Sequence, residues 1–414
     1  MQQRSVVVIG AGMVGVSCAA YLARDGHHVT LIDALGPAEG TSKGNAGALS
    51  PGSCVPLAMP GVLKKVPKWL TDPAGPLTVR PAYFFTVLPW LVRFVLAARR
   101  SRIGPIADAL RTLHARTYEC YEPLLAHAGR TGAIRKSGTL VVYESESAFA
   151  ASRGEWEMRG GRGVRFEVLD ASALRTVEPA LSERYRRGVL LPEHGYLIEP
   201  YELVRALADQ FVRDGGCLLR TRAQGLRFGA AGLAAVRTDD GEVTAERVVI
   251  AAGAWSLPLI APLGLKLPLE SQRGYHVTLG APNVAPRLPV TSSERKFYAT
   301  PMAGGLRIAG TVEFAGLAAP PDFRRARRLL EQGRQMYPAL DTTHFSEWMG
   351  HRPCLPDSLP VIGPAPGHPD VLLAFGHGHN GMTSGPVTGR VIADLVAGRP
   401  PFIDIAPYRA ERFR

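Results

Sequence analysis

The sequence predicts an α/β fold, α+β overall, in which a discontinuous domain with a parallel sheet encloses an inserted domain with a mixed sheet. Strand-like and helical segments alternate at both ends of the chain, which is typical of a parallel sheet covered by helices. The middle of the chain is more mixed, and 414 residues exceed what one hydrophobic core usually supports. We therefore expect 1–80, 155–270 and 350–414 to form the first domain, and 81–154 and 271–349 to form the second.

Apolar runs and helical periodicity locate the individual elements. Strands are expected at 5–9, 28–33, 138–143, 188–191, 247–252, 305–310 and 370–375. Helices are expected at 14–25, 107–128, 200–214, 323–336 and 384–397.

The composition is that of an ordinary folded protein, with 46% hydrophobic and 20% charged residues. The formal net charge of +12 fits nucleic acid, an anionic membrane surface or acidic ligands. Basic residues are scattered and aromatic side chains do not interleave them, which speaks against a nucleic-acid platform. The five cysteines form no Cys-x-x-Cys pair, so the sequence favours reduced thiols over a zinc site or a disulfide framework.

The longest apolar stretch, FFTVLPWLVRFVLAA at 84–98, is followed directly by Arg99 and Arg100. It contains a proline and an arginine, and it is shorter than the roughly 20 apolar residues of a transmembrane helix. Two alternatives stay open: the segment lies on a membrane surface, or it packs on the protein's own core. The N-terminal residues lack the pattern of a secretory signal, so we expect a cytoplasmic protein, peripheral at the inner face of the membrane under the first alternative.

A glycine-rich loop carries the most specific local signal, in VVVIGAGMVGVSCAAYLARDGHHVTLID. Its three glycines permit a tight turn, a close approach to a pyrophosphate and close packing of helix on strand. The helix that follows presents free N–H groups and a partial positive charge to phosphates. The acid that ends the next strand would bind both hydroxyls of an adenosine ribose. The residues expected to hold a dinucleotide, either FAD or NAD on this loop alone, are Gly10, Gly12, Met13, Val14, Gly15 and Asp33.

Further segments place small residues where a backbone would crowd a cofactor: GTSKGNAGALSPG at 40–52, RVVIAAGAWSLPL at 247–259 and GHGHNGMTSG at 376–385. With GHRPCLPDSLPVIG at 350–363, they give the chain a resemblance to the D-amino acid oxidase-like FAD oxidoreductases from about residue 5 to 412. Within these it is similar to the bacterial D-amino acid dehydrogenase small-subunit group. The resemblance implies a Rossmann-like FAD-binding domain with an inserted mixed-sheet substrate domain. It also implies FAD contacts at Thr41, Ser42, Asn45, Ala46, Gly47, Ala223, Ala252, Gly253, Gly376, His377, Gly378, Asn380, Gly381, Met382 and Thr383.

The same resemblance implies substrate-contacting residues. Arg352 falls on the arginine that pairs with the substrate carboxylate, which a guanidinium binds bidentately without losing its charge. Tyr298 would lie over the flavin with its hydroxyl near that carboxylate, and Tyr275 and His276 are further pocket candidates. From the residues alone, a structural ion pair stays open for Arg352 and an ordinary sheet position for Tyr298. The two histidines of the GHGHNGMT loop have no cysteine or carboxylate beside them, so we expect no metal site.

The implied activity is dehydrogenation of a D-amino acid by hydride transfer from its α-carbon to flavin N5. The segments GHGHNGMT and TVEFAGL are similar to those of relatives acting on D-proline and cis-4-hydroxy-D-proline, which favours cyclic D-imino acids as substrates. We expect a quinone or the respiratory chain as electron acceptor. Two alternatives stay open: a glycine- or sarcosine-type oxidase that uses O2, and a flavin-binding subunit of a hetero-oligomeric dehydrogenase.

Overall fold

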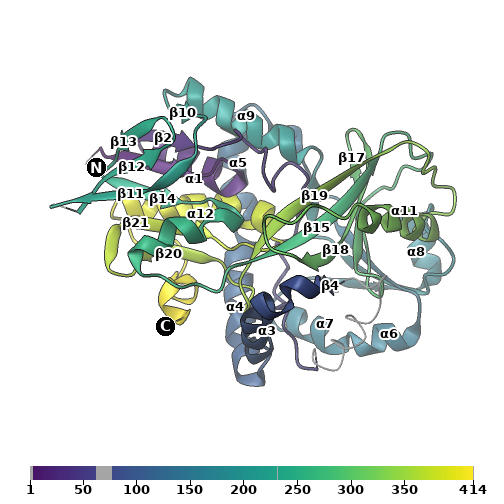
Figure 1. Cartoon of the computed structure of the whole chain (residues 1–414). Coiled ribbons are helices and arrows are strands. Elements are labelled where there is room, and N and C mark those ends of the chain that lie inside the picture. Colours follow the sequence, from purple (N-terminus) through teal and green to yellow (C-terminus); the bar gives the residue numbers. More distant parts are fainter. Residues whose placement is uncertain (1–2, 62–76, 231, 414) are drawn as a thin grey trace.

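The computed structural model describes residues 3–61, 77–230 and 232–413, in which two large sheets form the centres of two lobes (Figure 1). The first sheet has the strand order β10-β2-β1-β14-β21-β20. All of its neighbouring strands run parallel except β20, which is antiparallel to β21. Its strands are β1 (Ser5–Ile9), β2 (His28–Ile32), β10 (Cys217–Leu219), β14 (Arg247–Ile250), β20 (Val361–Ala365) and β21 (His368–Phe375).

Helices α1 (Met13–Arg24) and α12 (Gly381–Val396) pack closely on this sheet. Gly389 permits a close approach of α12 to α1, because a Cβ atom at this position would lie 2.6 Å from the backbone of Ser17 on α1. Helices α4 (Arg100–Ala115), α5 (Thr117–His127) and α9 (Pro200–Arg213) contribute to the same core. Its fully buried members include Val6, Val8, Val16, Val387 and Val391.

The second sheet has nine strands in the order β19-β15-β18-β17-β16-β6-β8-β7, with β4 added beside β18. It is mixed, because β16 is parallel to β6 and β4 is parallel to β18. Its strands are β4 (Leu77–Val79), β6 (Thr139–Tyr143), β7 (Glu167–Leu169), β8 (Arg187–Leu191), β15 (Glu270–Leu279), β16 (Val290–Ser292), β17 (Phe297–Met302), β18 (Gly305–Phe314) and β19 (Phe345–Cys354). Helices α8 (Ala171–Val177) and α11 (Arg324–Met336) pack into a core with this sheet.

Smaller elements complete the described chain. Two three-stranded sheets contain β11 (Ala223–Gly229), β12 (Gly232–Thr238) and β13 (Gly241–Thr244), and β3 (Ala48–Leu49), β9 (Gly195–Leu197) and β5 (Ile134–Arg135). The remaining α-helices are α3 (Phe84–Ala97), α6 (Glu146–Ala151), α7 (Arg153–Gly160) and α10 (Leu257–Ile260). In the described residues, no single helix combines the length and apolar composition of a membrane span. The pair Pro81–Ala97 and Arg100–His127, bent by 91°, meets that test only jointly.

The predicted strands and helices are confirmed, with one break. The helix expected over 107–128 is divided at Arg116, whose ψ of 9° ends α4 before α5 begins. The expected domain division differs from the observed packing in three places. Strand β4, within 1–80, and strands β7 and β8, within 155–270, join the nine-stranded sheet. Helices α4 and α5, within 81–154, join the core of the six-stranded sheet. Residues 1–2 and 62–76 of the expected first domain lie outside the described part of the chain.

Candidate active site and cofactor site

The glycine turn between β1 and α1 has the predicted shape. Gly10 has a φ of 106°, and a Cβ atom there would lie 2.5 Å from the carbonyl oxygen of Ala251 at the end of β14. A Cβ atom at Gly15 would overlap the carbonyl oxygen of Gly10, because α1 approaches β1 so closely. Gly12 caps the helix without a side chain, while Met13 N–H donates to Ser42 Oγ at 3.0 Å. This turn therefore joins α1, β14 and the 40–47 loop.

Asp33 lies just beyond β2, beside that turn. Its Oδ2 accepts a hydrogen bond from Ala11 N–H at 2.8 Å. Its Oδ1 accepts from the N–H groups of Leu35 and Gly36 at 2.8 and 2.9 Å. Three backbone donors thus fix the carboxylate at the place where the sequence predicts a ribose-binding acid.

The 40–47 loop, which contains five of the predicted cofactor residues, is held by one face of the nine-stranded sheet. Within the loop, Asn45 Oδ1 accepts from Gly47 N–H at 2.8 Å. At its start, Thr41 Oγ1 donates to His351 O at 2.7 Å. Three side chains of the nine-stranded sheet donate hydrogen bonds to carbonyl groups of the loop: His276 Nδ1 to Gly44 O (2.9 Å), Arg307 Nη1 to Asn45 O (2.6 Å) and Thr300 Oγ1 to Ala46 O (2.8 Å). This contact brings the first domain against the second.

The C-terminal loop meets the same region. Gly376 and Gly378 have positive φ angles of 87° and 54°, and Gly378 N–H donates to Pro353 O at 2.8 Å. His377 Nε2 bonds Thr388 Oγ1 at 2.8 Å, and burial lowers the pKa of this histidine to about 3. At the start of α12, Thr383 Oγ1 accepts from Ser50 N–H and donates to Ala48 O, at 3.2 and 3.3 Å. The predicted residues Asn380, Gly381 and Met382 form the N-terminus of this helix.

Three predicted cofactor residues lie at the ends of other strands of the first domain. Ala252 and Gly253 follow β14 directly, beyond the Ala251 carbonyl group that the glycine turn approaches. Ala223 begins β11, pairs with Thr238 and packs partly buried against the core below the six-stranded sheet.

Arg352 on β19 is a half-buried cation on the sheet face that holds the 40–47 loop. Its Nη1 donates to Thr311 O at 3.0 Å, and it forms no ion pair within the described part of the chain. Burial lowers the pKa of this guanidinium. A Cβ atom at Gly274 would overlap the guanidinium, so the side chain lies flat over that glycine. Because a buried charge is costly without a counter-ion, this position suits an anionic ligand.

The expected binding of one carboxylate by both Tyr298 and Arg352 stays a prediction: their strands are separated, while the Arg352 guanidinium reaches across β15 to Thr311 on β18. Tyr298 pairs with Ala309, and Ala309 pairs with His276, so these three share a face with Arg352. Two strands lie between β17 and β19, which places them roughly 14 Å apart at about 4.8 Å per step. The hydroxyl group of Tyr298 bonds Thr139 Oγ1 at 3.3 Å, on β6. It therefore points away from β19, and burial raises its pKa.

His276 and Tyr275 lie on opposite faces of β15, because successive side chains of a strand alternate. His276 is buried on the site face, where its pKa is lowered to about 3 by burial and then by the charge of Arg307. Tyr275 belongs to the core under α11, and its hydroxyl group donates to Glu313 Oε2 at 2.6 Å. The prediction of Tyr275 as a pocket residue is wrong for this reason.

The comparisons with known proteins agree with this arrangement. A family described as FAD dependent oxidoreductase matches residues 5–395. The chain is 40% identical to a D-amino-acid oxidase of Bradyrhizobium diazoefficiens, over 99% of both chains. It is 34% identical to a D-amino acid dehydrogenase of Rhizorhabdus wittichii, over 99% of this chain and 100% of the other.

The chain belongs to the FAD dependent oxidoreductase family.

Solved structures show the same fold for this FAD-dependent oxidoreductase. Glycine oxidase from Geobacillus kaustophilus has a TM-score of 0.74 at 23% identity, over 99% of each chain. L-proline dehydrogenase from P. horikoshii has a TM-score of 0.75 at 20% identity, over 100% of this chain and 98% of the other. FAD is accordingly the cofactor, and the residues present fit it. Gly10 and Gly15 leave no room for a Cβ atom, α1 begins without a capping side chain, and Asp33 lies beside the turn.

Sequence reasoning missed two residues of the site. His379 Nε2 donates to Gln272 Oε1 at 3.2 Å, and Gln272 pairs with Arg352 across β15 and β19. Burial lowers the pKa of His379 to about 3. Trp348 stacks on His276, with ring centroids 5.1 Å apart and an interplanar angle of 18°. The signal for Trp348 is Gly350, two residues further along β19, because a glycine inside a strand marks a close approach and a Cβ atom there would meet the indole.

Proposed function

We propose that this FAD-dependent oxidoreductase oxidises the carbon–nitrogen bond of D-amino acids, with cyclic D-imino acids such as D-proline or cis-4-hydroxy-D-proline as preferred substrates. The observation that carries the proposal is Arg352, a half-buried guanidinium that forms no ion pair in the described chain, on the face that meets the predicted FAD loops. The names of the curated relatives, an oxidase and dehydrogenases of D-amino acids, support the substrate class.

The role of Arg352 is to bind the substrate carboxylate and so to orient the α-carbon. A guanidinium group donates two parallel hydrogen bonds to a carboxylate in the same plane, and Gly274 keeps the space beside Arg352 free of a side chain. FAD, when bound, supplies the flavin N5 that accepts the hydride of the α-carbon. Holding the Cα–H bond in one direction lowers the barrier by proximity, without a protein acid or base.

The neighbouring histidines supply neutral acceptors rather than charge. Because a carbonyl oxygen only accepts, His276 Nδ1 carries its proton toward Gly44 O and leaves Nε2 as an acceptor. His379 likewise directs Nε2–H at Gln272 and leaves Nδ1 as an acceptor. A neutral imidazole beside a fixed cation favours an amine that arrives uncharged and donates its N–H. The substrate's ammonium group therefore releases its proton to solvent before the hydride leaves the α-carbon.

The preference for a cyclic substrate is supported by the flat surface beside Arg352. Gly274 and Gly350 face each other across β15 and β19, and the indole of Trp348 occupies the space where Gly350 would have a Cβ. A compact aliphatic ring packs on such an aromatic wall with few rotatable bonds to restrict. An open-chain substrate fills the same space less completely.

The electron acceptor is proposed to be a quinone at the inner face of the membrane, with O2 as the second candidate. The relatives' names support both, since the 40% identical protein is named an oxidase and others are named dehydrogenases. Reoxidation of the substrate-reduced protein by O2 and by a short-chain ubiquinone, each measured by stopped flow, distinguishes them. A faster reaction with O2 at equal concentrations would overturn the quinone proposal.

The reaction itself is tested by anaerobic reduction of the purified yellow protein, followed in the visible band of the oxidised flavin. We expect D-proline and cis-4-hydroxy-D-proline to bleach the flavin, with D-alanine slower by about tenfold in kcat/KM, the effect of a modest packing difference. Faster reduction by D-alanine would overturn the cyclic preference. Retention of the full colour with all D-amino acids would overturn the reaction class and favour a flavin-binding subunit.

A further inference from the structure

Helix α3 (Phe84–Ala97) presents a continuous apolar stripe to solvent. Phe85, Leu88, Val92 and Leu96 are 82%, 39%, 52% and 37% exposed. Their spacing of three and four residues puts all four on one side of the helix. Large apolar side chains gathered on one exposed face mark a site of contact with an apolar partner.

The opposite side of α3 is firmly packed, so the stripe does not reflect a loosely attached helix. Val87 is fully buried and Trp90 is 5% exposed, in a cluster with Phe314 and Cys354. Trp90 Nε1 donates to Cys354 O at 3.3 Å. Cys354 ends β19, two residues after Arg352, so α3 rests directly on the strand that carries the substrate-binding cation.

The charge beside the stripe has one sign. Arg93, Arg99, Arg100 and Arg102 follow or flank the four apolar residues, and none forms an ion pair within the described part of the chain. The sequence contains no aspartate or glutamate anywhere in 73–107. An apolar stripe bordered by these arginines complements a surface that is apolar inside and anionic at its boundary.

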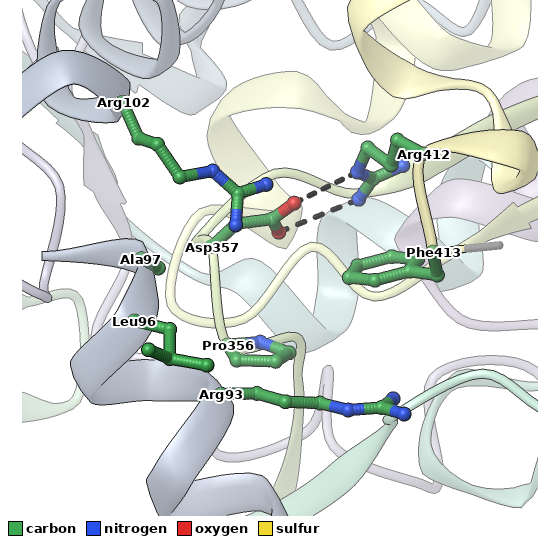
Figure 2. Close-up of a pocket in the computed structure, with 8 residues that line it drawn as sticks. All are labelled: Arg93, Leu96, Ala97, Arg102, Pro356, Asp357, Arg412 and Phe413. Atoms are coloured by element: carbon green, nitrogen blue, oxygen red, sulfur yellow. Dashed lines mark hydrogen bonds and ion pairs between the residues drawn. The ribbon is translucent and has the colours of Figure 1, made fainter. Parts of the chain in front are cut away.

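A cavity of about 180 Å³ opens at the C-terminal end of the stripe, between α3, the start of α4 and the chain's C-terminus (Figure 2). Arg93, Arg102 and Arg412 line it together with Asp357. Asp357 is neutralised by Arg412, whose Nε lies 2.8 Å from Oδ2. Among the described residues, the other two arginines have no carboxylate partner, which gives the cavity the character of a phosphate-binding niche.

We propose that α3 docks this protein on an anionic phospholipid surface. The stripe Phe85–Leu88–Val92–Leu96 enters the boundary between head groups and acyl chains, and the arginines bind lipid phosphates. A helix of 14 residues measures about 21 Å, so it lies in the plane of the interface. Docking in this position brings the membrane next to the end of β19, where a lipid-soluble reactant gains a short path to the site.

Vesicle flotation of the FAD-loaded protein tests the docking, with phosphatidylcholine vesicles in the presence and absence of phosphatidylglycerol. We expect binding to vesicles that contain phosphatidylglycerol, at least tenfold weaker binding to pure phosphatidylcholine, and release as salt shortens the Debye length from about 10 Å at 0.1 M. No binding to anionic vesicles would overturn the proposal. Because flotation needs no turnover, its result is independent of whether D-amino acids reduce the flavin.

Matched variants separate the stripe from general surface effects. Phe85→Glu and Val92→Glu are expected to weaken binding at least tenfold, and Arg93→Gln with Arg102→Gln to remove the preference for phosphatidylglycerol. Val212→Glu on α9 is the control, since Val212 is 43% exposed outside the stripe and gains the same charge. Equal binding by Val92→Glu and Val212→Glu would overturn the proposal. So would a dimer without lipid that Val92→Glu dissociates, because a second copy would then cover the stripe.

Discussion

Replacing Arg352 with methionine should remove most of the activity while changing the stability of the fold by no more than about 2–3 kcal/mol. The structure gives Arg352 one hydrogen bond, to Thr311 O, and no ion pair in the described chain. Leaving that carbonyl group unsatisfied costs about 1–3 kcal/mol. Replacing buried ionic groups with apolar side chains stabilises many proteins by about 1–4 kcal/mol. The two effects leave a net change between a loss of about 2 kcal/mol and a gain of about 3 kcal/mol.

The effect on catalysis is a loss. Removing one partner of a buried, hydrogen-bonded ion pair costs about 3–5 kcal/mol, because the remaining charge is left without compensation. For a carboxylate bound in the transition state, this equals a loss of about two to four orders of magnitude in kcat/KM. The unfolding entropy of about 2.1 cal/mol/K per residue makes each kcal/mol worth about 1 °C in Tm for 414 residues. Tm should therefore lie between about 2 °C below and about 3 °C above that of the unmodified chain.

Arg273 offers a matched control on the other face of the neighbouring strand. It is fully buried, lies 3.6 Å from a carboxylate oxygen of Glu313, and donates to the carbonyl groups of Gly316, Ala319 and Pro320. Arg273→Met should lower Tm by about 3–5 °C and leave kcat/KM per bound flavin within about threefold. Thermal unfolding and anaerobic flavin reduction are measured on the same preparations. If Arg352→Met loses as much Tm as Arg273→Met and keeps its kcat/KM, Arg352 is a structural cation and the proposed site is refuted.

The remaining predictions concern the surroundings of this cation. The substitutions Gly274→Ala and Gly350→Ala should each lower kcat/KM by about 10- to 100-fold, because the added Cβ atoms would overlap Arg352 and Trp348 respectively. Gly304→Ala is the control and should leave kcat/KM unchanged, since its Cβ atom would have its nearest neighbour at 3.7 Å. The value of kcat/KM should rise with pH through a single ionisation whose pKa changes with that of the substrate amine. His276 and His379, with pKa values of about 3, do not titrate in that range. A second ionisation near neutrality that is the same for all substrates would contradict this. The free energy of unfolding should fall as pH drops below about 6.5, by about 1.4 kcal/mol per pH unit for each of the buried His276 and His377. Only the unfolded chain gains protons there until the folded pKa of about 3 is reached, so denaturant midpoints that stay constant from pH 6.5 to 5 would count against their burial. Tyr275→Phe should lower Tm, because it removes the hydrogen bond to Glu313. Tyr298→Phe should change kcat/KM by less than about threefold, because the Tyr298 hydroxyl group bonds Thr139. A hundredfold loss of kcat/KM in Tyr298→Phe would show that this hydroxyl group reaches the substrate.

Local patterns in the sequence predict the first domain well because its chemistry is local. The three glycines, Asp33 and the strands around them lie within one βαβ unit, where spacing fixes position. The alternation of side chains along a strand also shows that Tyr275 and His276 cannot both face one pocket. That constraint follows from their adjacent positions in the chain, and it selects His276 once the core face of β15 is recognised.

Strand order is the part that spacing does not determine. Tyr298 and Arg352 share a face, but two intervening strands separate them, and nothing in either segment states that distance. Strand β8 likewise joins the nine-stranded sheet through pairing with β6, which lies more than 20 residues away in the sequence, and β7 joins the sheet through β8. Such contacts depend on the whole topology, because a strand's own residues define which face is apolar but not which neighbour it meets.

The concentration of unfavourable features around Arg352 is itself an argument for function. Gly274 and Gly350 lie inside paired strands, where glycine costs about 0.5–1 kcal/mol relative to alanine. Thr311, whose carbonyl oxygen accepts the bond from Arg352, has a φ of 61°, which a β-branched residue rarely adopts, and its buried hydroxyl group has no partner among the described residues. Arg352 adds a desolvated charge. Packing alone would favour larger side chains, an extended Thr311 and an apolar residue in place of the cation. Four costs at one point of a well-packed sheet are consistent with a surface shaped for a carboxylate, because binding that anion offsets the charge and uses the space that the glycines leave.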